Sequence, residues 1–233
     1  MQKTMNFRNE LKYYIHLHDY LALRSRLRAV MQKDPYTDHN NQYHVRSLYF
    51  DDIYNTALED KLDGYQKRKK FRIRFYNLDH RFIRLEKKAK VGEYIRKESL
   101  RISREECDRI LERDIDFLPH SDNKLLHQLY MEMKTRLLKP IVIVDYIREA
   151  YVHPMQNIRI TFDKHLKTGM YTTDLFGKDL TTLKTIHTPE IIMEIKFNHF
   201  LPDHIRNLIQ IPAEKRSSIS KYVICRRFSE RSS

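Results

Sequence analysis

Basic residues alternate with apolar ones through Lys67–Tyr76, a segment whose Phe, Ile and Tyr content favours a β-strand. Read with a period of two, its side chains divide between two faces, with Lys70, Arg72 and Arg74 on one and Lys69, Phe71, Ile73 and Phe75 on the other. Neighbouring cations on one face lie about 7 Å apart and repel each other by about 0.6 kcal/mol in water, or roughly 2.4 kcal/mol at an effective dielectric of about 20. Such a row is stable without a partner if it is solvated, but it requires a bound polyanion if it is enclosed.

Five other segments carry charged or polar residues on one face of a predicted strand. They are Glu10 with Lys12, Glu86 with Lys88 and Lys90, Tyr146 with Arg148, Arg159 with Asp163, and Glu194 with Lys196. Cations from several strands can surround a chain of phosphates and donate charge-assisted hydrogen bonds to it. The glutamates among them would repel phosphate, so they either neutralise surplus cations or hold a divalent metal that bridges phosphate oxygens.

Each of these pairs also has a simpler interpretation. A lone Lys-x-Lys or Glu-x-Lys pair is more often a solvated strand face or a weak surface ion pair than a ligand site. The 12 histidines show no metal-ligand spacing, and the serines at 47, 217, 218 and 220 lack the context of a catalytic nucleophile. Only the joint occurrence of charged faces on many strands favours a phosphate-binding site.

The elements that must position these side chains can be followed along the chain. Period-two alternation predicts strands at residues 7–15, 43–51, 67–76, 81–90, 93–101, 141–151, 157–166 and 191–198. Apolar spacing predicts helices at residues 18–31, 52–62, 103–115, 123–138, 202–209 and 218–227. Ser103 and Glu106 form a capping box at the start of the third helix. Residues 168–187 are polar and turn-rich, which predicts a loop with one short strand or helix.

These elements predict a single α+β domain over residues 1–233, because no linker or internal repeat divides the chain. In this arrangement, helices cover the apolar face of the sheet and the charged face points inward, whereas the interior of a packed barrel is apolar. The physical solution is an eight-stranded antiparallel closed β-barrel, with flanking helices outside and a wet, polyanion-filled lumen.

Composition limits the partners and the compartment. The net charge of +13 predicts an anionic partner such as nucleic acid, a membrane surface or phosphorylated small molecules, and only 4 glycines argue against a glycine-rich phosphate loop. Cys107 and Cys225 have no metal spacing and suggest a reducing compartment. No apolar run approaches a membrane span, and the Met1 end lacks the apolar region of a signal peptide. We therefore expect a cytoplasmic protein.

Seven short segments, in order, resemble the catalytic domain of VTC-type (vacuolar transporter chaperone) polyphosphate polymerases, in the triphosphate tunnel metalloenzyme or CYTH-like superfamily. They are residues 8–13, 45–51, 70–76, 85–88, 146–148, 158–163 and 193–196, and the resemblance extends to Ser220-Lys221-Tyr222. The fold of that family is an eight-stranded antiparallel tunnel. The resemblance therefore implies the architecture that the charged faces indicate.

The resemblance also implies roles for individual residues. Stabilisation of the transferring phosphoryl group is expected from the catalytic residues Arg72, Arg74, Arg148 and Lys88. Phosphate binding is expected from Lys12, Lys70, Arg159, Lys196, Lys221 and Ser220, the last beside Lys221 on a terminal helix near a tunnel mouth. Mn²⁺ or Mg²⁺ would be ligated by Glu194, with Glu10 and Glu86 as helpers.

The chain departs from the family pattern in two respects. The superfamily signature Glu-x-Glu-x-Lys stands here as Arg8-x-Glu10-x-Lys12, which loses one acid. The chain begins at the barrel, so we expect neither the phosphate-sensing SPX domain nor the membrane helices of the eukaryotic subunits.

Three functions are compatible with these features. The first is a polyphosphate polymerase, which transfers the γ-phosphoryl group of ATP to the end of an inorganic polyphosphate chain. The second is a metal-dependent tripolyphosphatase or nucleoside triphosphatase of the same fold, with water as the acceptor. The third is a non-enzymatic module that binds polyphosphate or RNA, although no RNA-recognition signature is present and we expect no nucleic-acid partner. The densely cationic lumen and the VTC-like segments favour the polymerase.

Overall fold

The computed structural model describes residues 9–92, 94–169, 172–177, 182–184, 191–210 and 216–231. The chain forms two compact units that interleave in sequence. The first unit comprises Met1–His44, Tyr146–Leu166 and Ile186–Ser220, and the second comprises Val45–Asp145, Lys167–Thr185 and Lys221–Ser233. The prediction of a single domain is not tested by this division and stays a prediction.

The first unit is built on strands that carry the alternating charges. Its elements are β1 (Asn9–Ile15), α1 (Leu17–Val30), β2 (Gln32–Lys33), β10 (Ile191–Phe197), α5 (Asp203–Ile209), most of β8 (Arg159–Gly169) and the second half of β7 (Lys139–Val152). The strands hydrogen-bond in the order β1-β10-β8-β7, and β2 pairs with β7. The pairs β1–β10, β10–β8 and β2–β7 are antiparallel.

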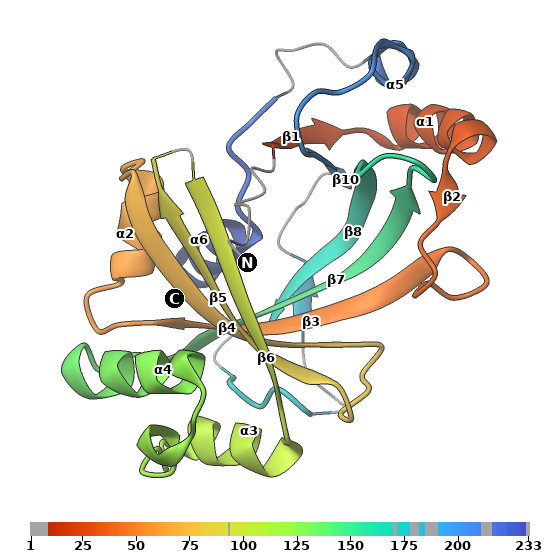
Figure 1. Cartoon of the computed structure of the whole chain (residues 1–233). Coiled ribbons are helices and arrows are strands. Elements are labelled where there is room, and N and C mark those ends of the chain that lie inside the picture. Colours follow the sequence, from red (N-terminus) through yellow and green to blue (C-terminus); the bar gives the residue numbers. More distant parts are fainter. Residues whose placement is uncertain are drawn as a thin grey trace, which may run out of the picture. The chain divides into compact units, whose positions relative to one another are not determined.

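One face of this sheet forms the apolar core of the first unit. Alternate residues of β1, β8 and β10 point to that face, and helices α1 and α5 cover it (Figure 1). Its fully or nearly fully buried members include Ile15, Leu27, Ile160, Phe162, Met193 and Ile205. Because strand side chains alternate, burial of this set directs the charged residues of the same strands to the opposite face.

The second unit repeats this plan with different elements. They are β3 (Gln42–Asp51), α2 (Thr56–Leu62), β4 (Lys67–Tyr76), β5 (Ile83–Val91), β6 (Tyr94–Ile102), α3 (Arg104–Glu112), the 3-10 turn η1 (Leu118–His120), α4 (Lys124–Thr135), β9 (Thr182–Lys184) and α6 (Lys221–Arg231). Strands β3, β4, β5 and β6 pair in sequence order, with β7 next to β3. The predicted capping box is present at α3, where Glu106 N donates to Ser103 Oγ at 3.0 Å.

Helices lie against both faces of the sheet in the second unit. Helices α3 and α4 pack on the apolar face, where Phe71, Ile73 and Phe75 of β4 are buried (Figure 1). Helix α6 packs on the charged face, because its Tyr222 ring lies 5.2 Å from the Tyr49 ring and Lys70 Nζ lies 4.2 Å above Tyr222.

The α+β class, antiparallel pairing and flanking helices are thus confirmed. The full strand order is β1-β10-β8-β7-β3-β4-β5-β6, and closure of this sheet into a barrel stays a prediction. Among the described residues, no helix combines the length and the apolar character that crossing a membrane requires.

Several element boundaries differ from the prediction, among them those of α6 and α4. Helix α6 begins at Lys221, so Ser220 precedes this helix and the prediction that placed it on the helix is wrong. Helix α4 ends at Thr135, and Pro140 belongs to β7, which begins at Lys139. Proline is tolerated there because the start of a strand can lack one backbone donor.

Candidate functional site

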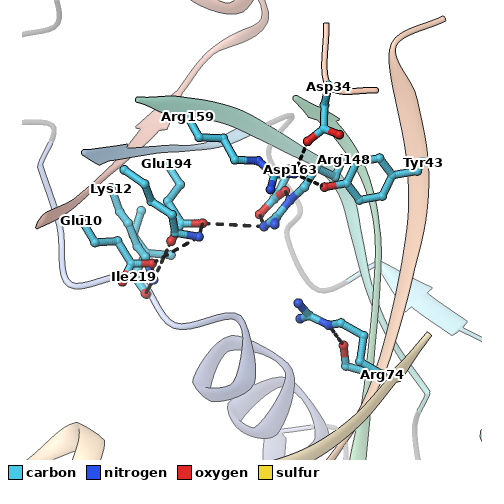
Figure 2. Close-up of polar contacts among 12 residues, drawn as sticks. Glu10, Lys12, Asp34, Tyr43, Arg74, Arg148, Arg159, Asp163, Glu194 and Ile219 are labelled. Atoms are coloured by element: carbon cyan, nitrogen blue, oxygen red, sulfur yellow. Dashed lines mark hydrogen bonds and ion pairs between the residues drawn. The ribbon is translucent and has the colours of Figure 1, made fainter. Parts of the chain in front are cut away.

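The polar face of the first unit collects side chains from four strands. Strand register places Glu10 opposite Lys196, Lys12 opposite Glu194, and Glu194 opposite Thr161. The predicted residues that meet on this face are Glu10, Lys12, Arg148, Arg159, Glu194 and Lys196, together with Asp163 (Figure 2). These cations therefore share one face of the first unit, and their roles in phosphate binding and catalysis stay predictions.

Glu10, Lys12, Glu194 and Lys196 form an alternating square of charges. Lys12 Nζ lies 3.6 Å from Glu10 Oε1 and 3.8 Å from Glu194 Oε1. Lys196 Nζ lies 3.9 Å from Glu10 Oε1 and 3.1 Å from Glu194 Oε2. Lys12 also donates to the carbonyl of Ile219 at 3.2 Å, which ties β1 to the segment before α6. The two lysines are neutralised here, so an anionic ligand must compete with two carboxylates.

Arg148 is the most buried cation of this face. Its guanidinium donates to both carboxylate oxygens of Asp163, from Nε at 2.6 Å and from Nη2 at 2.8 Å (Figure 2). The same Nη2 lies 3.7 Å from Glu194 Oε2. Burial alone would lower the pKa of Arg148, but the charge of Asp163 outweighs burial and raises it well above the usual value. Arg148 is thus a fixed cation with one edge turned towards Glu194.

Arg159 is held by two groups that the sequence analysis did not identify. Its Nη2 lies 2.5 Å from Asp34 Oδ2 and donates to the Tyr43 hydroxyl at 2.8 Å (Figure 2). Asp34 is buried in the turn after β2, where its backbone N–H donates to the carbonyl of Ala150 at 3.1 Å. Asp34 lies outside a long strand, so no alternation of polar and apolar residues in the sequence marks it. Its contact with Arg159 is seen only in the folded chain.

The polar face of the second unit carries Arg72 and Arg74 with different partners. Arg72 Nε donates to Glu86 Oε2 at 2.7 Å, and its Nη1 donates to the Tyr49 hydroxyl at 2.8 Å. Arg74 Nε donates to the neutral Ser47 hydroxyl at 2.8 Å (Figure 2). The charge of Arg74 also helps to lower the pKa of Glu86, so the guanidinium places a cation beside this carboxylate on the polar face.

Glu86 acts in the second unit as a shared counter-ion. Its Oε1 lies 2.6 Å from Lys97 Nζ and its Oε2 lies 2.6 Å from Arg72 Nη2. Burial would raise the pKa of Glu86, but the charges of Arg72, Arg74 and Lys97 lower it to about 2. Both oxygens of Glu86 contact cations at 2.6 Å, whereas the cation contacts of Glu194 are 3.1–3.8 Å long, so Glu86 fits the neutralising role better than the predicted role of a metal ligand.

The other predicted cations of the second unit are Lys70 on β4, Lys88 on β5 and Lys221 at the start of α6. Lys70 is opposite Lys88 in the β4–β5 register, and Lys88 is exposed. Lys221 is partly buried at the start of α6, and its charge helps to lower the pKa of Tyr49. Burial, reinforced by the nearby charges of Lys61, Arg68 and Lys88, lowers the pKa of Lys70 to about 7. This end of the face therefore brings several cations close together, with Asp51 as an opposing charge near Lys70.

The donor set around Glu194 fits a hard divalent cation that also binds substrate oxygens. Among the described residues, no cluster of three or more His, Cys, Asp and Glu side chains could hold a metal by itself. Mg²⁺, however, is commonly bound by one or two carboxylates together with substrate phosphates. The buried hydroxyl of Thr161, opposite Glu194, has no hydrogen-bond partner within the described part of the chain. Glu194, Glu10 and this unused oxygen could complete such a site.

Comparison with solved structures finds the same fold in other proteins. A Hippeastrum protein described as an adenylyl cyclase candidate with a dominant triphosphatase activity shares 13% sequence identity, with a TM-score of 0.56 over 94% of each chain. An adenylate cyclase candidate from Bacillus halodurans shares 14% identity, with a TM-score of 0.51 over 90% of this chain and 88% of that one. One from Vibrio parahaemolyticus shares 14% identity, with a TM-score of 0.50 over 94% and 97%. At these identities, the likeness shows a shared fold alone.

The family assignment comes from the sequence itself. No curated protein sequence matches the chain. The model of the family described as VTC domain, in contrast, matches residues 7–229, which is nearly the whole chain. This match covers both units and every predicted site residue. The chain therefore belongs to the VTC domain family.

Proposed function

We propose that the protein is a polyphosphate polymerase that transfers the γ-phosphoryl group of ATP to the terminal phosphate of an inorganic polyphosphate chain. The observation that carries the proposal is the sorting of charge in each unit. Cations from neighbouring strands share the face opposite the apolar core, and carboxylates hold several of them in place. Enclosure of the phosphate chain by a closed tunnel, as the resemblance implies, is part of the proposal.

The proposed reaction requires no protein nucleophile, because the terminal phosphate oxygen of the chain attacks the γ-phosphorus of ATP and ADP leaves. Catalysis then consists of positioning and charge neutralisation. In this proposal, Arg72, Arg74 and Arg148 stabilise the transferring group, with Lys88 as a further catalytic cation. Lys12, Lys70, Arg159, Lys196, Ser220 and Lys221 bind the phosphate chain.

The proposal assigns Glu194 and Glu10 to Mn²⁺ or Mg²⁺. When bound, the metal neutralises phosphate oxygens and thereby lowers the barrier to their attack or departure. Release of Lys12 and Lys196 from the two carboxylates would then leave both lysines available for phosphate. Metal and polyanion binding are therefore expected to reinforce each other at this square of charges.

A triphosphatase is the second candidate, because the Hippeastrum protein of the same fold is described as having that activity. It would use the same cationic faces and a water molecule in place of the terminal phosphate. The two functions differ only in the acceptor, so a product assay separates them.

The test is incubation of the full chain with γ-labelled ATP and Mn²⁺ or Mg²⁺, followed by sizing of the products on a gel. A ladder of long phosphate chains is expected. Free phosphate alone would replace the polymerase with the hydrolase, and tight polyphosphate binding without turnover would leave a binding module. Arg74→Ala and Glu194→Ala are expected to abolish turnover, whereas the exposed Arg81→Ala is expected to preserve it.

A further inference from the structure

The hairpin tip of the second unit exposes several large apolar side chains. We define this tip as residues 65–68, 90–92 and 94–96, at the ends of β4, β5 and β6 (Figure 1). The exposed fractions are 59% for Tyr65, 55% for Val91, 56% for Tyr94 and 40% for Ile95. Single exposed apolar residues need no explanation, but a group of them at one end of three paired strands indicates an interaction surface.

Strand register places these apolar residues beside cations on both faces of the tip. On one face Lys67, Val91 and Tyr94 are successive cross-strand neighbours, and on the other Arg68, Lys90 and Ile95 are. Direct cross-strand neighbours lie about 5 Å apart, so each row presents its cation and its apolar group together. Gly92 N donates to the carbonyl of Gln66 at 3.1 Å, which joins the two sides of the tip.

The charge of this region is strongly one-sided. Residues 65–70 and 87–97 contain one acid, Glu93, which lies outside the described residues, and nine basic residues: Lys67, Arg68, Lys69, Lys70, Lys87, Lys88, Lys90, Arg96 and Lys97. Three of these cations pair with carboxylates beyond the two ranges, Lys69 with Glu132, Arg96 with Glu98 and Lys97 with Glu86. Tyrosine together with long basic side chains is the composition favoured at the membrane–water interface, where the ring and the methylene stems lie among headgroups and the charges meet anionic lipid.

We propose that the hairpin tip docks the protein on an anionic lipid surface. The cations attract the surface, and Val91, Tyr94 and Ile95 enter the headgroup region. A polyphosphate chain running over the tip would explain the cations but not the exposed apolar groups. A second protein chain would be expected to require a flat or grooved apolar face, whereas the tip consists of the β5–β6 turn and the adjoining start of β4.

A fluorescent reporter tests the proposal directly, because the chain contains no tryptophan. Tyr94→Trp is mixed with vesicles of phosphatidylcholine alone or with added phosphatidylglycerol. We expect a blue shift of the emission only with phosphatidylglycerol and only at low salt, because the attraction is screened. Tyr36→Trp, at a residue that is 85% exposed in the first unit, is the matched control and should show no shift.

Vesicle flotation of the full chain separates the contributions of the basic and the apolar side chains to lipid binding. The triple variant Lys67→Gln, Lys90→Gln, Arg96→Gln should bind on the order of a hundredfold more weakly, at roughly fivefold for each cation removed. The triple variant Val91→Ser, Tyr94→Ser, Ile95→Ser should also lose vesicle binding while it keeps polyphosphate binding. The proposal is overturned if the apolar triple variant still floats with the vesicles, or if the emission of the Tyr94→Trp reporter shifts equally with phosphatidylcholine alone. It is also overturned if the emission shifts with protein concentration in the absence of vesicles, because that result would indicate binding of a second copy of the chain. These vesicle measurements do not require polymerase activity, so the lipid proposal can fail or hold independently of the proposed function.

Discussion

Asp163 holds Arg148 on the polar face of the first unit by two parallel hydrogen bonds, at 2.6 and 2.8 Å. Both residues are buried, so the plane of the guanidinium is fixed before any ligand arrives. Such a carboxylate does not need to touch the substrate to affect the reaction, because it determines where the arginine points.

Replacement of Asp163 by asparagine is expected to reduce turnover about 10- to 100-fold, with a smaller effect on triphosphate affinity. The amide N–H₂ would face an arginine N–H and turn the guanidinium away. Loss of a partner from a buried ion pair also costs stability, about 3–5 kcal/mol. Steady-state kinetics and denaturant unfolding measure the two effects separately.

The pair Asp79–Arg81 offers a matched control, because Arg81 donates to both carboxylate oxygens at 2.9 Å while the arginine is exposed. Asp79→Asn should leave turnover unchanged and alter stability little, because solvent screens an exposed ion pair. Equal behaviour of the two variants would show that Asp163 does not position Arg148.

Thr161 is expected to contribute to function at a cost in stability. Its buried hydroxyl has no hydrogen-bond partner within the described residues, and an unsatisfied buried hydroxyl costs about 1–3 kcal/mol. Thr161→Val keeps the shape and should therefore increase the free energy of unfolding. If the hydroxyl assists the metal beside Glu194, the same variant should need a higher Mn²⁺ concentration for half-maximal activity. A metal titration that matches wild type would remove Thr161 from the site.

Glu194→Gln should change binding and turnover in opposite directions. Without metal, the variant is expected to bind triphosphate several-fold more tightly, because one negative charge is gone and Lys196 is released from its contact at 3.1 Å. With Mn²⁺ or Mg²⁺, turnover should fall at least about a hundredfold. Calorimetry in a chelator and a kinetic assay give the two values.

Glu132 is the matched control for this charge removal, because it also pairs with a lysine, Lys69, but contacts it from α4 on the apolar face of the sheet. Glu132→Gln should leave triphosphate affinity and turnover unaltered. Weaker triphosphate binding by Glu194→Gln without metal would contradict the interpretation of Glu194 as a counter-ion that phosphate must displace.

The sequence predicts which residues share a face far better than it predicts their partners. Alternation is a local property, so the cationic side of β4 and the Glu194–Lys196 pair follow from spacing alone. Asp34 and Tyr43 reach Arg159 through tertiary contacts and could not be found in this way. The misplaced start of α6 has a similar cause, because the backbone of Ser217 pairs with Lys12 of β1 instead of entering the helix.

Lys70 should couple phosphate binding to proton uptake. Burial and the nearby charges of Lys61, Arg68 and Lys88 lower its pKa to about 7, so at pH 8 the free protein holds Lys70 mostly neutral. A bound polyanion favours the charged form and raises that pKa, so binding draws in a proton. The affinity for triphosphate should consequently fall as the pH rises from about 7 towards the higher pKa of the bound state.

Calorimetry of triphosphate binding at pH 8, in two buffers with different ionisation enthalpies, measures this uptake. We expect uptake approaching one proton for the wild type and markedly less for Lys70→Arg, which stays charged throughout and should bind more tightly at that pH. Lys88→Arg is the matched control, because Lys88 is the exposed cross-strand neighbour of Lys70 on the same face, and it should keep the wild-type uptake. Equal uptake by Lys70→Arg and the wild type would show that the proton comes from another group and that Lys70 is not among the residues that contact phosphate.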